Sequence, residues 1–150
     1  MARSGRIAAL VALLLLAAHP ADSARAAPPV AQAITKLNDL RRSHGLRALR
    51  TSDSLMRSAE AYSDTMMERQ YFGHASRIHA SPRYQRLGEI IDIHVGLDPD
   101  VPWAFRDWLG SPPHLTVMLD PLFTRVGAGY SVGRFQGRVC TIWTMHFGRP

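Results

Sequence analysis

Three side chains in the middle of the chain have the types that metal or acid–base chemistry requires: His74, Glu89 and His114. Two imidazoles and one carboxylate, with a fourth position open, form the ligand set of many catalytic zinc sites. No H-E-x-x-H motif and no cysteine cluster accompanies them. The residue types therefore allow a divalent metal, with zinc the first candidate and His74 and His114 its ligands, but they do not require one.

Ser111 and His114 form an S-x-x-H pair at the start of an expected helix. A nucleophilic serine needs a base within hydrogen-bond reach and an oxyanion hole. His114 is one helical turn away, so it could be that base. No G-x-S-x-G elbow surrounds Ser111, however, and a serine in this position often caps a helix. Helix capping is the simpler interpretation of Ser111, and serine-based hydrolysis is the alternative.

Glu89 stands directly before an apolar run that begins at Ile90. A carboxylate at the mouth of a buried strand needs a partner, because burying a bare charge is costly. A histidine is a suitable partner. Two interpretations stay open: Glu89 fixes the orientation of an imidazole, or it acts as an acid or base. The candidates for catalysis are Glu89 and His114.

The elements that must position these residues follow from hydrophobic periodicity and helix punctuation. Helices are expected at 30–43, 54–69 and 98–110, and from 112 to the proline at 121. Strands are expected at 89–95, 126–132 and 139–147, the last two as a hairpin, and a short helical turn at 81–87. Helices come first and the paired strands last, which favours the α+β class over a parallel α/β sheet.

The first 26 residues have the pattern of a secretory signal peptide. Arg3 and Arg6 precede an apolar stretch at 7–18, and A-R-A at 24–26 offers a cleavage site. The stretch is short for a membrane anchor, so cleavage of the signal peptide is expected. An uncleaved membrane anchor is the alternative. We expect a single mature domain at 27–150 with no transmembrane span, located outside the cytoplasm: extracellular, in the cell wall or in the periplasm.

Charge and composition exclude some partners. The net charge of +6 becomes +4 without the leader, because three arginines and one aspartate are lost. The remaining arginines are scattered and not interleaved with aromatic residues, so no nucleic-acid interface is expected. A basic surface could favour anionic wall polymers, although plain solubility explains it as well.

Cysteine and tryptophan are expected in the interior. Cys140 is the only cysteine, so the chain has no internal disulfide. It stands in a strand-like run and is expected to be a buried, inert thiol. Trp103, Trp108 and Trp143 are expected to be core anchors whose indole N–H groups donate to the backbone, with a cleft-lining role as the alternative for Trp108.

Four segments, in their order and spacing, resemble the CAP family (SCP-like extracellular domains) in its short bacterial single-domain form. They are the helix at 37–45, Y-F-G-H at 71–74, G-E at 88–89 and W-L-G-S-P-P-H at 108–114. The resemblance implies a three-layer α-β-α sandwich with a central, mainly antiparallel sheet and an open cleft. It places His74, Glu89, Ser111 and His114 in that cleft. Many members carry a second glutamate where Ser111 stands, so a mechanism that needs two carboxylates lacks one here.

Three functions stay open. The first is a binding module that holds a small apolar or cell-wall-derived ligand in the His/Glu-lined cleft, with a weakly bound divalent metal. The second is a hydrolase in which a metal or the His/Glu set activates water. The third is a structural or surface interaction protein with a vestigial cleft. The serine at position 111 favours binding over hydrolysis.

Overall fold

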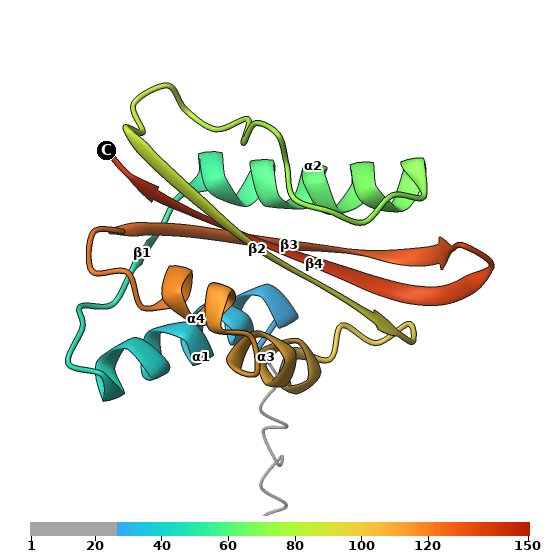
Figure 1. Ribbon diagram of the computed structural model, residues 1–150, viewed down its shortest axis with the longest axis horizontal. Coiled ribbons are helices and arrows are strands. Elements are labelled where there is room, and N and C mark those ends of the chain that lie inside the picture. Colours follow the sequence, from blue (N-terminus) through green and yellow to red (C-terminus); the bar gives the residue numbers. More distant parts are fainter. Residues whose placement is uncertain (1–26) are drawn as a thin grey trace, which may run out of the picture.

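The computed structural model describes residues 27–150, and the expected signal peptide at 1–26 lies outside them. The elements in chain order are α1 (Pro29–Ser43), β1 (Arg50–Thr51), α2 (Asp53–Arg69), β2 (Arg86–Val95), α3 (Val101–Leu109), α4 (Pro112–Met118), β3 (Arg125–Phe135) and β4 (Arg138–Arg149) (Figure 1). No helix in this part of the chain is long and apolar enough to cross a membrane.

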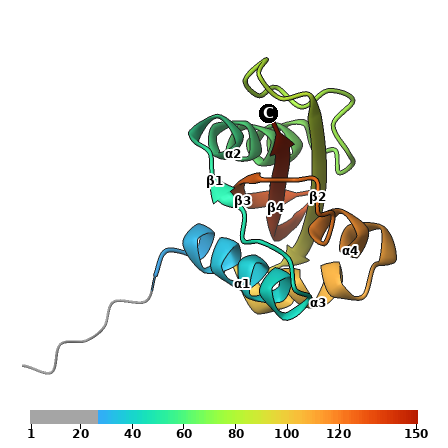
Figure 2. The ribbon, with the colours of Figure 1, turned by 90° about the vertical axis from the view of Figure 1, so that its left-hand side faces the viewer.

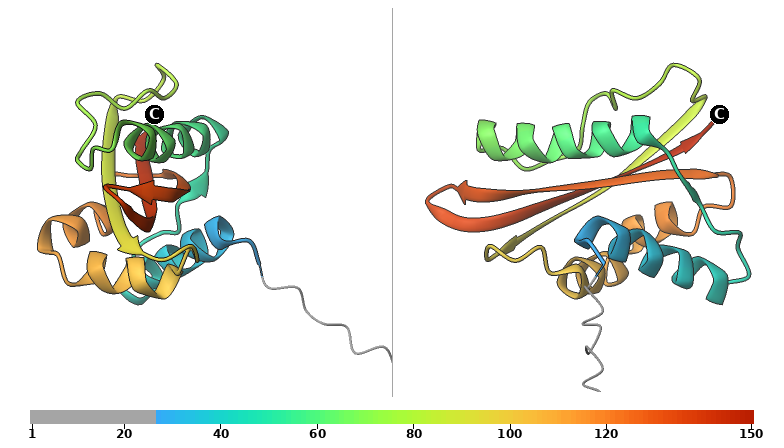
Figure 3. Two further views of the ribbon diagram at one scale, coloured as in Figure 1. Left: turned by 90° about the vertical axis from the view of Figure 1, so that its right-hand side faces the viewer. Right: turned by 180° about the vertical axis from the view of Figure 1, so that it is seen from behind.

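The four strands form one sheet in the order β1-β3-β4-β2. β4 pairs antiparallel with both β2 and β3, and the short β1 pairs parallel with β3. Helix α2 covers one face of the sheet, while α1, α3 and α4 cover the other (Figures 1 and 3). This arrangement confirms the α+β class and the three-layer α-β-α sandwich with a mainly antiparallel sheet.

Two glycines of β3 let α2 lie directly on the sheet. A Cβ added at Gly127 would be 2.1 Å from the backbone of Leu55, and one at Gly129 would be 2.4 Å from the backbone of Glu60. Both positions therefore allow helix and strand backbones to approach. The helix ends at Arg69, and the next residue, Gln70, adopts a left-handed φ of 54° and starts the loop that carries His74.

The core has two parts, one on each face of the sheet. The larger part lies under α1, α3 and α4 and includes Trp108, Trp143 and Phe147. The smaller part lies under α2 and includes Ile91 and Cys140. The predictions that Trp108 and Trp143 are core residues and that Cys140 is buried are confirmed.

Three predictions were wrong. The helical turn expected at 81–87 is reduced to one hydrogen-bonded turn, in which the N–H of Tyr84 donates to the carbonyl of Ser81 at 3.2 Å, because β2 already begins at Arg86 and pairs there with Arg149. Trp103 is 42% exposed instead of buried, because it lies near the start of α3 with its ring beneath the guanidinium of Arg106. The indole N–H of buried Trp143 has no hydrogen-bond partner within residues 27–150.

Candidate functional site

Glu89 is the centre of the site and is held by the pairing of β2 with β4. Glu89 and His146 are direct cross-strand partners in this antiparallel pair. The Oε2 atom of Glu89 lies 2.8 Å from Nε2 of His146, and the two side chains are only 6% and 1% exposed. The ring of Tyr62, from α2, lies 6.2 Å from the His146 ring. The strand pair and α2 together therefore enclose one side of the carboxylate.

The loop after α2 encloses the other side. The Oε1 atom of Glu89 lies 2.8 Å from Nδ1 of His74, and it accepts a hydrogen bond of 2.9 Å from the backbone N–H of Ala75. The hydroxyl of Tyr62 donates to the carbonyl of Gly73 at 2.6 Å, which ties the same loop to α2. Glu89 thus fastens the loop at 70–83 to the sheet.

The partners of Glu89 decide its charge. Burial raises the pKa of this carboxyl, but the hydrogen bonds from His146, Ala75 and His74 favour the ionised form and outweigh burial, so the net pKa is lowered. Burial, and then the nearby charge of Glu89, raise the pKa of Tyr62 to about 12. Glu89 is therefore an ionised acceptor, and each of its oxygens takes part in at least one hydrogen bond.

His114 reaches the site from the opposite helical layer. It lies in the first turn of α4, and its ring centroid is 6.2 Å from that of His74. Because β2 is the edge strand, a residue of the loop after α2 and a residue of α4 can meet beside it (Figure 2). Burial, and then the nearby His74, lower the pKa of His114. Its Nδ1 is buried without a hydrogen-bond partner within residues 27–150.

A metal at this site would have few protein ligands. His74 and His114 could each offer an imidazole, but both oxygens of Glu89 already accept hydrogen bonds. Within residues 27–150, no three His, Cys, Asp or Glu side chains are grouped so that they could hold a metal ion. The donor set therefore fits a two-histidine site completed by water or by a ligand, and not the three-ligand set of a catalytic zinc.

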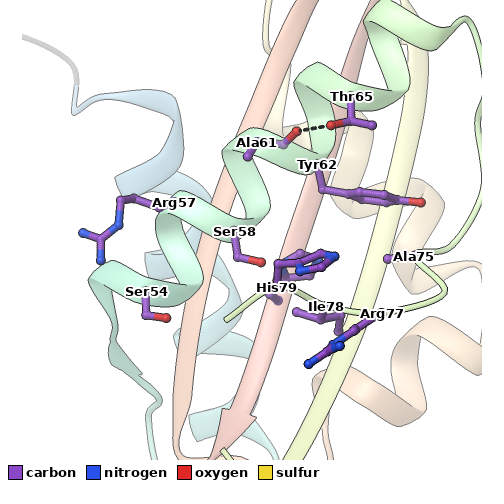
Figure 4. Close-up of a pocket in the computed structure, with 11 residues that line it drawn as sticks. Ser54, Arg57, Ser58, Ala61, Tyr62, Thr65, Ala75, Arg77, Ile78 and His79 are labelled. Carbon is purple, nitrogen blue, oxygen red and sulfur yellow. Dashed lines mark hydrogen bonds between the residues drawn. The ribbon is translucent and has the colours of Figure 1, made fainter. Parts of the chain in front are cut away.

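A pocket of about 350 Å³ lies beside the Glu89 anchor, between α2 and the loop at 70–83. The pocket is lined by Ser54, Arg57, Ser58, Ala61, Tyr62, Thr65, Ala75, Arg77, Ile78, His79 and His146. Ile78 and His79 of the loop lie across from Ser58 and Tyr62 of α2 (Figure 4). His146 is common to the pocket and the anchor, whereas His74, Glu89 and His114 do not line the pocket. The site thus consists of a histidine pair and a neighbouring pocket whose lining mixes polar and apolar side chains.

The structure brings His74, Glu89 and His114 together, but it places two expected cleft residues differently. Trp108 is fully buried, and its Nε1 donates to the carbonyl of Ile91 at 3.0 Å, so the cleft-lining alternative for Trp108 is wrong. Ser111 stands next to the site as the N-cap of α4, but its side chain makes no capping hydrogen bond. The simpler interpretation of Ser111 as a side-chain cap is therefore also wrong.

Sequence reasoning missed His146 and Tyr62. The period of its helix assigns Tyr62 to the apolar stripe, and His146 stands out in the sequence only as a distant neighbour of Cys140. A signal for His146 was present, because residues 140, 142, 144 and 146 share one face of a strand. Only the register with β2 shows that this face brings His146 opposite Glu89.

A three-layer sandwich in which a loop histidine, a strand glutamate and a helix histidine meet at the sheet edge is an SCP-like domain. The chain belongs to the family described as the Cysteine-rich secretory protein family, CAP, whose sequence profile matches residues 34–147. Members of this family are generally extracellular proteins.

Individual relatives agree with this assignment. The chain is 30% identical over 119 residues to the uncharacterized protein YkwD of Bacillus subtilis, an alignment that covers 73% of this chain and 43% of that protein. The chain thus spans less than half the length of this relative.

Two solved structures share the fold. An outer surface protein from Borrelia burgdorferi has a TM-score of 0.67 at 16% identity, covering 81% of this chain and 92% of that one. An extracellular protein containing a SCP domain from Bacillus anthracis has a TM-score of 0.65 at 24% identity, covering 81% and 40%.

Proposed function

We propose that this protein is a secreted CAP-domain binding module. It holds a small cell-wall-derived ligand in the pocket beside the Glu89 anchor and binds a divalent metal weakly through His74 and His114. One observation supports binding over hydrolysis above all others. Both oxygens of Glu89 accept hydrogen bonds, from His146 on one side and from His74 and Ala75 on the other.

A general base must present a free oxygen to the proton that it removes. Glu89 is only 6% exposed, each of its oxygens already accepts a hydrogen bond, and its lowered pKa makes it a weak base. The second carboxylate that a paired mechanism needs is replaced by Ser111. Glu89 acts instead as a structural anchor that sets the position of the loop and hence the shape of the pocket.

The pocket lining indicates the chemistry of the ligand. Its lining includes the polar residues Ser54, Ser58 and Arg77, whereas the hydroxyls of Tyr62 and Thr65 already donate to the carbonyls of Gly73 and Ala61. These donors suit hydroxyl and carboxylate groups better than a purely apolar molecule. A volume of about 350 Å³ is at the small end of ligand pockets. Part of a peptidoglycan fragment, such as one sugar or the carboxylate end of its peptide, matches this description.

The two imidazoles would hold the metal, and solvent or a ligand oxygen would complete its coordination. Such a metal would supply a positive charge that attracts an anionic group of the ligand. Because His114 has a lowered pKa, its ring stays neutral at neutral pH, which is the form that can coordinate. With only two protein ligands, the affinity is expected to be low.

Ligand binding can be tested with soluble disaccharide-peptide fragments from muramidase-digested peptidoglycan, measured by native mass spectrometry and calorimetry on the mature protein. We expect saturable binding that Arg77→Ala weakens, since it removes a cation from the pocket lining. Arg69→Ala is the matched control, because Arg69 is an exposed arginine outside the lining. Absence of binding, or equal loss in both variants, would refute the proposed ligand.

Metal binding is tested separately by zinc titration. The double variant His74→Ala/His114→Ala should lose zinc binding, whereas His44→Ala should retain it, because His44 is exposed at the end of α1. Wild-type protein with no zinc-dependent change in melting temperature would remove the metal from the proposal and leave the ligand pocket intact.

A further inference from the structure

A second pocket, of about 550 Å³, lies where the connection after α1 meets the start of β3. It shares no lining residue with the pocket of Figure 4. Four arginines contribute to its lining, Arg41, Arg47, Arg50 and Arg125, and none of the residues that line it is acidic. None of these four arginines belongs to the Glu89 site or to the pocket beside it.

Arg41 is fixed in place and buried. Only 1% of Arg41 is exposed, and its guanidinium donates to three backbone carbonyls. The distances are 3.1 Å from Nε to Arg47, 2.7 Å from Nη1 to Met118 and 3.1 Å from Nη1 to Asp120. These hydrogen bonds use Nε and Nη1. Within residues 27–150 the Nη2 group makes none, so it is available to a ligand.

The carbonyls satisfy donors of Arg41 without neutralising its charge. Burial lowers the pKa of Arg41, and the carboxylate of Asp120 opposes this shift only in part. That carboxylate is itself paired with Arg86 at 2.6 Å. A buried cation with no carboxylate of its own is stabilised by an added anion.

The other three arginines surround the same cavity. Arg50 and Arg125 are direct partners in the parallel pair of β1 and β3, which brings two like charges together. Within residues 27–150, Arg47, Arg50 and Arg125 take part in no ion pair. An anion in the cavity would therefore face several cations that no carboxylate within the described residues pairs with.

We propose that this pocket binds a phosphate-bearing ligand. The guanidinium of Arg41 contacts the phosphate from the base, and Arg47, Arg50 and Arg125 contact it from the rim. Planar guanidinium groups match phosphate oxygens in pairs, so several arginines on one cavity favour phosphate over a lone carboxylate. The buried ring of Phe123 gives the pocket an apolar wall next to these charges, and the volume admits more than a single phosphate.

The test uses pyrophosphate, titrated by calorimetry at constant ionic strength so that general screening does not change. The variant Arg47→Gln/Arg50→Gln/Arg125→Gln removes the rim and keeps the buried Arg41. The control Arg69→Gln/Arg138→Gln/Arg149→Gln also removes three positive charges, but from exposed arginines outside this pocket. Melting temperatures measured for both variants will check that the fold is retained.

We expect saturable binding of one pyrophosphate, weakened at least about tenfold in the rim variant and no more than about twofold in the control. Equal weakening in the two variants would show a diffuse basic surface, and no saturable binding would also overturn the proposal. Vesicles of phosphatidylglycerol and phosphatidylcholine distinguish the source of the phosphate. If the anionic vesicles compete with pyrophosphate, the ligand is a lipid headgroup; if they do not, it is a soluble or wall-bound phosphate.

Discussion

The carboxylate of Glu89 and the imidazole of His146 form a buried contact of 2.8 Å between residues 57 positions apart in the chain. The contact joins β2 to β4 across the sheet, and the same carboxylate holds the loop of His74 through its other oxygen. One side chain therefore connects the sheet, the loop and the histidine pair. Its replacement should affect stability as well as the site.

Glu89→Ala should lower the free energy of unfolding by about 1–3 kcal/mol, because it leaves the buried His146 without its acceptor. The expected decrease in melting temperature is several degrees, measured by calorimetry. Glu68→Ala is the control, since Glu68 is an exposed residue of α2. Equal melting temperatures for wild type and Glu89→Ala would contradict the anchoring role.

The lowered pKa of Glu89 predicts how stability depends on pH. A carboxyl whose pKa is lower in the folded state contributes stability above its unfolded value of 4.5, and loses this contribution as pH falls through its folded value. The stability difference between wild type and Glu89→Gln should be constant near neutral pH and shrink in acid below 4.5. Urea unfolding at a series of pH values measures it. A difference that stays unchanged in strong acid would show that ionisation of Glu89 is irrelevant.

The pKa of His114 should be below its ordinary 6.5 in an NMR titration, because burial and the neighbouring His74 both disfavour the imidazolium. His74→Ala removes only the smaller of these causes, so the pKa of His114 should rise part of the way back. His44→Ala should leave the titration unchanged. A pKa of His114 above 6.5 in the wild type would show that its surroundings stabilise the charge.

Gly129→Ala should destabilise the fold by about 1–3 kcal/mol or more, since the new methyl group would lie 2.4 Å from the backbone of α2. Gly133→Ala is the matched substitution in the same strand. Its methyl group would lie 3.2 Å from the flexible side chain of Met67, which can move. Chemical denaturation should therefore give Gly129→Ala a much lower free energy of unfolding than Gly133→Ala. The reverse order would show that α2 can shift on the sheet.

Cys140 should react slowly with a thiol reagent in the absence of denaturant, because it is 5% exposed and packed under α2. Labelling should become fast in denaturant. Fast labelling of the native protein would instead indicate opening of the smaller core.

The sequence predicted the longer elements because each has a clear period or boundary. The helix that ends at Arg69 and the hairpin of β3 and β4 are examples. It could not predict β1, since two residues carry no periodicity. His74, Glu89 and His114 were identified through the family resemblance, whereas His146 depends on strand register. Arg41 was missed as a buried group because its three acceptors are backbone carbonyls, which every sequence contains.

His74 and His114 meet around the edge strand, each coming from a different layer of the sandwich. A ligand held by both rings would therefore cross-link residues 74 and 114 and close the segment between them, which contains β2 and α3, into a loop. Such a cross-link is reversible, and its contribution to the stability of the folded state rises with ligand concentration. Amide exchange along β2 would then become slower as the ligand concentration rises, so the stability of the sheet edge would depend on how much ligand surrounds the protein.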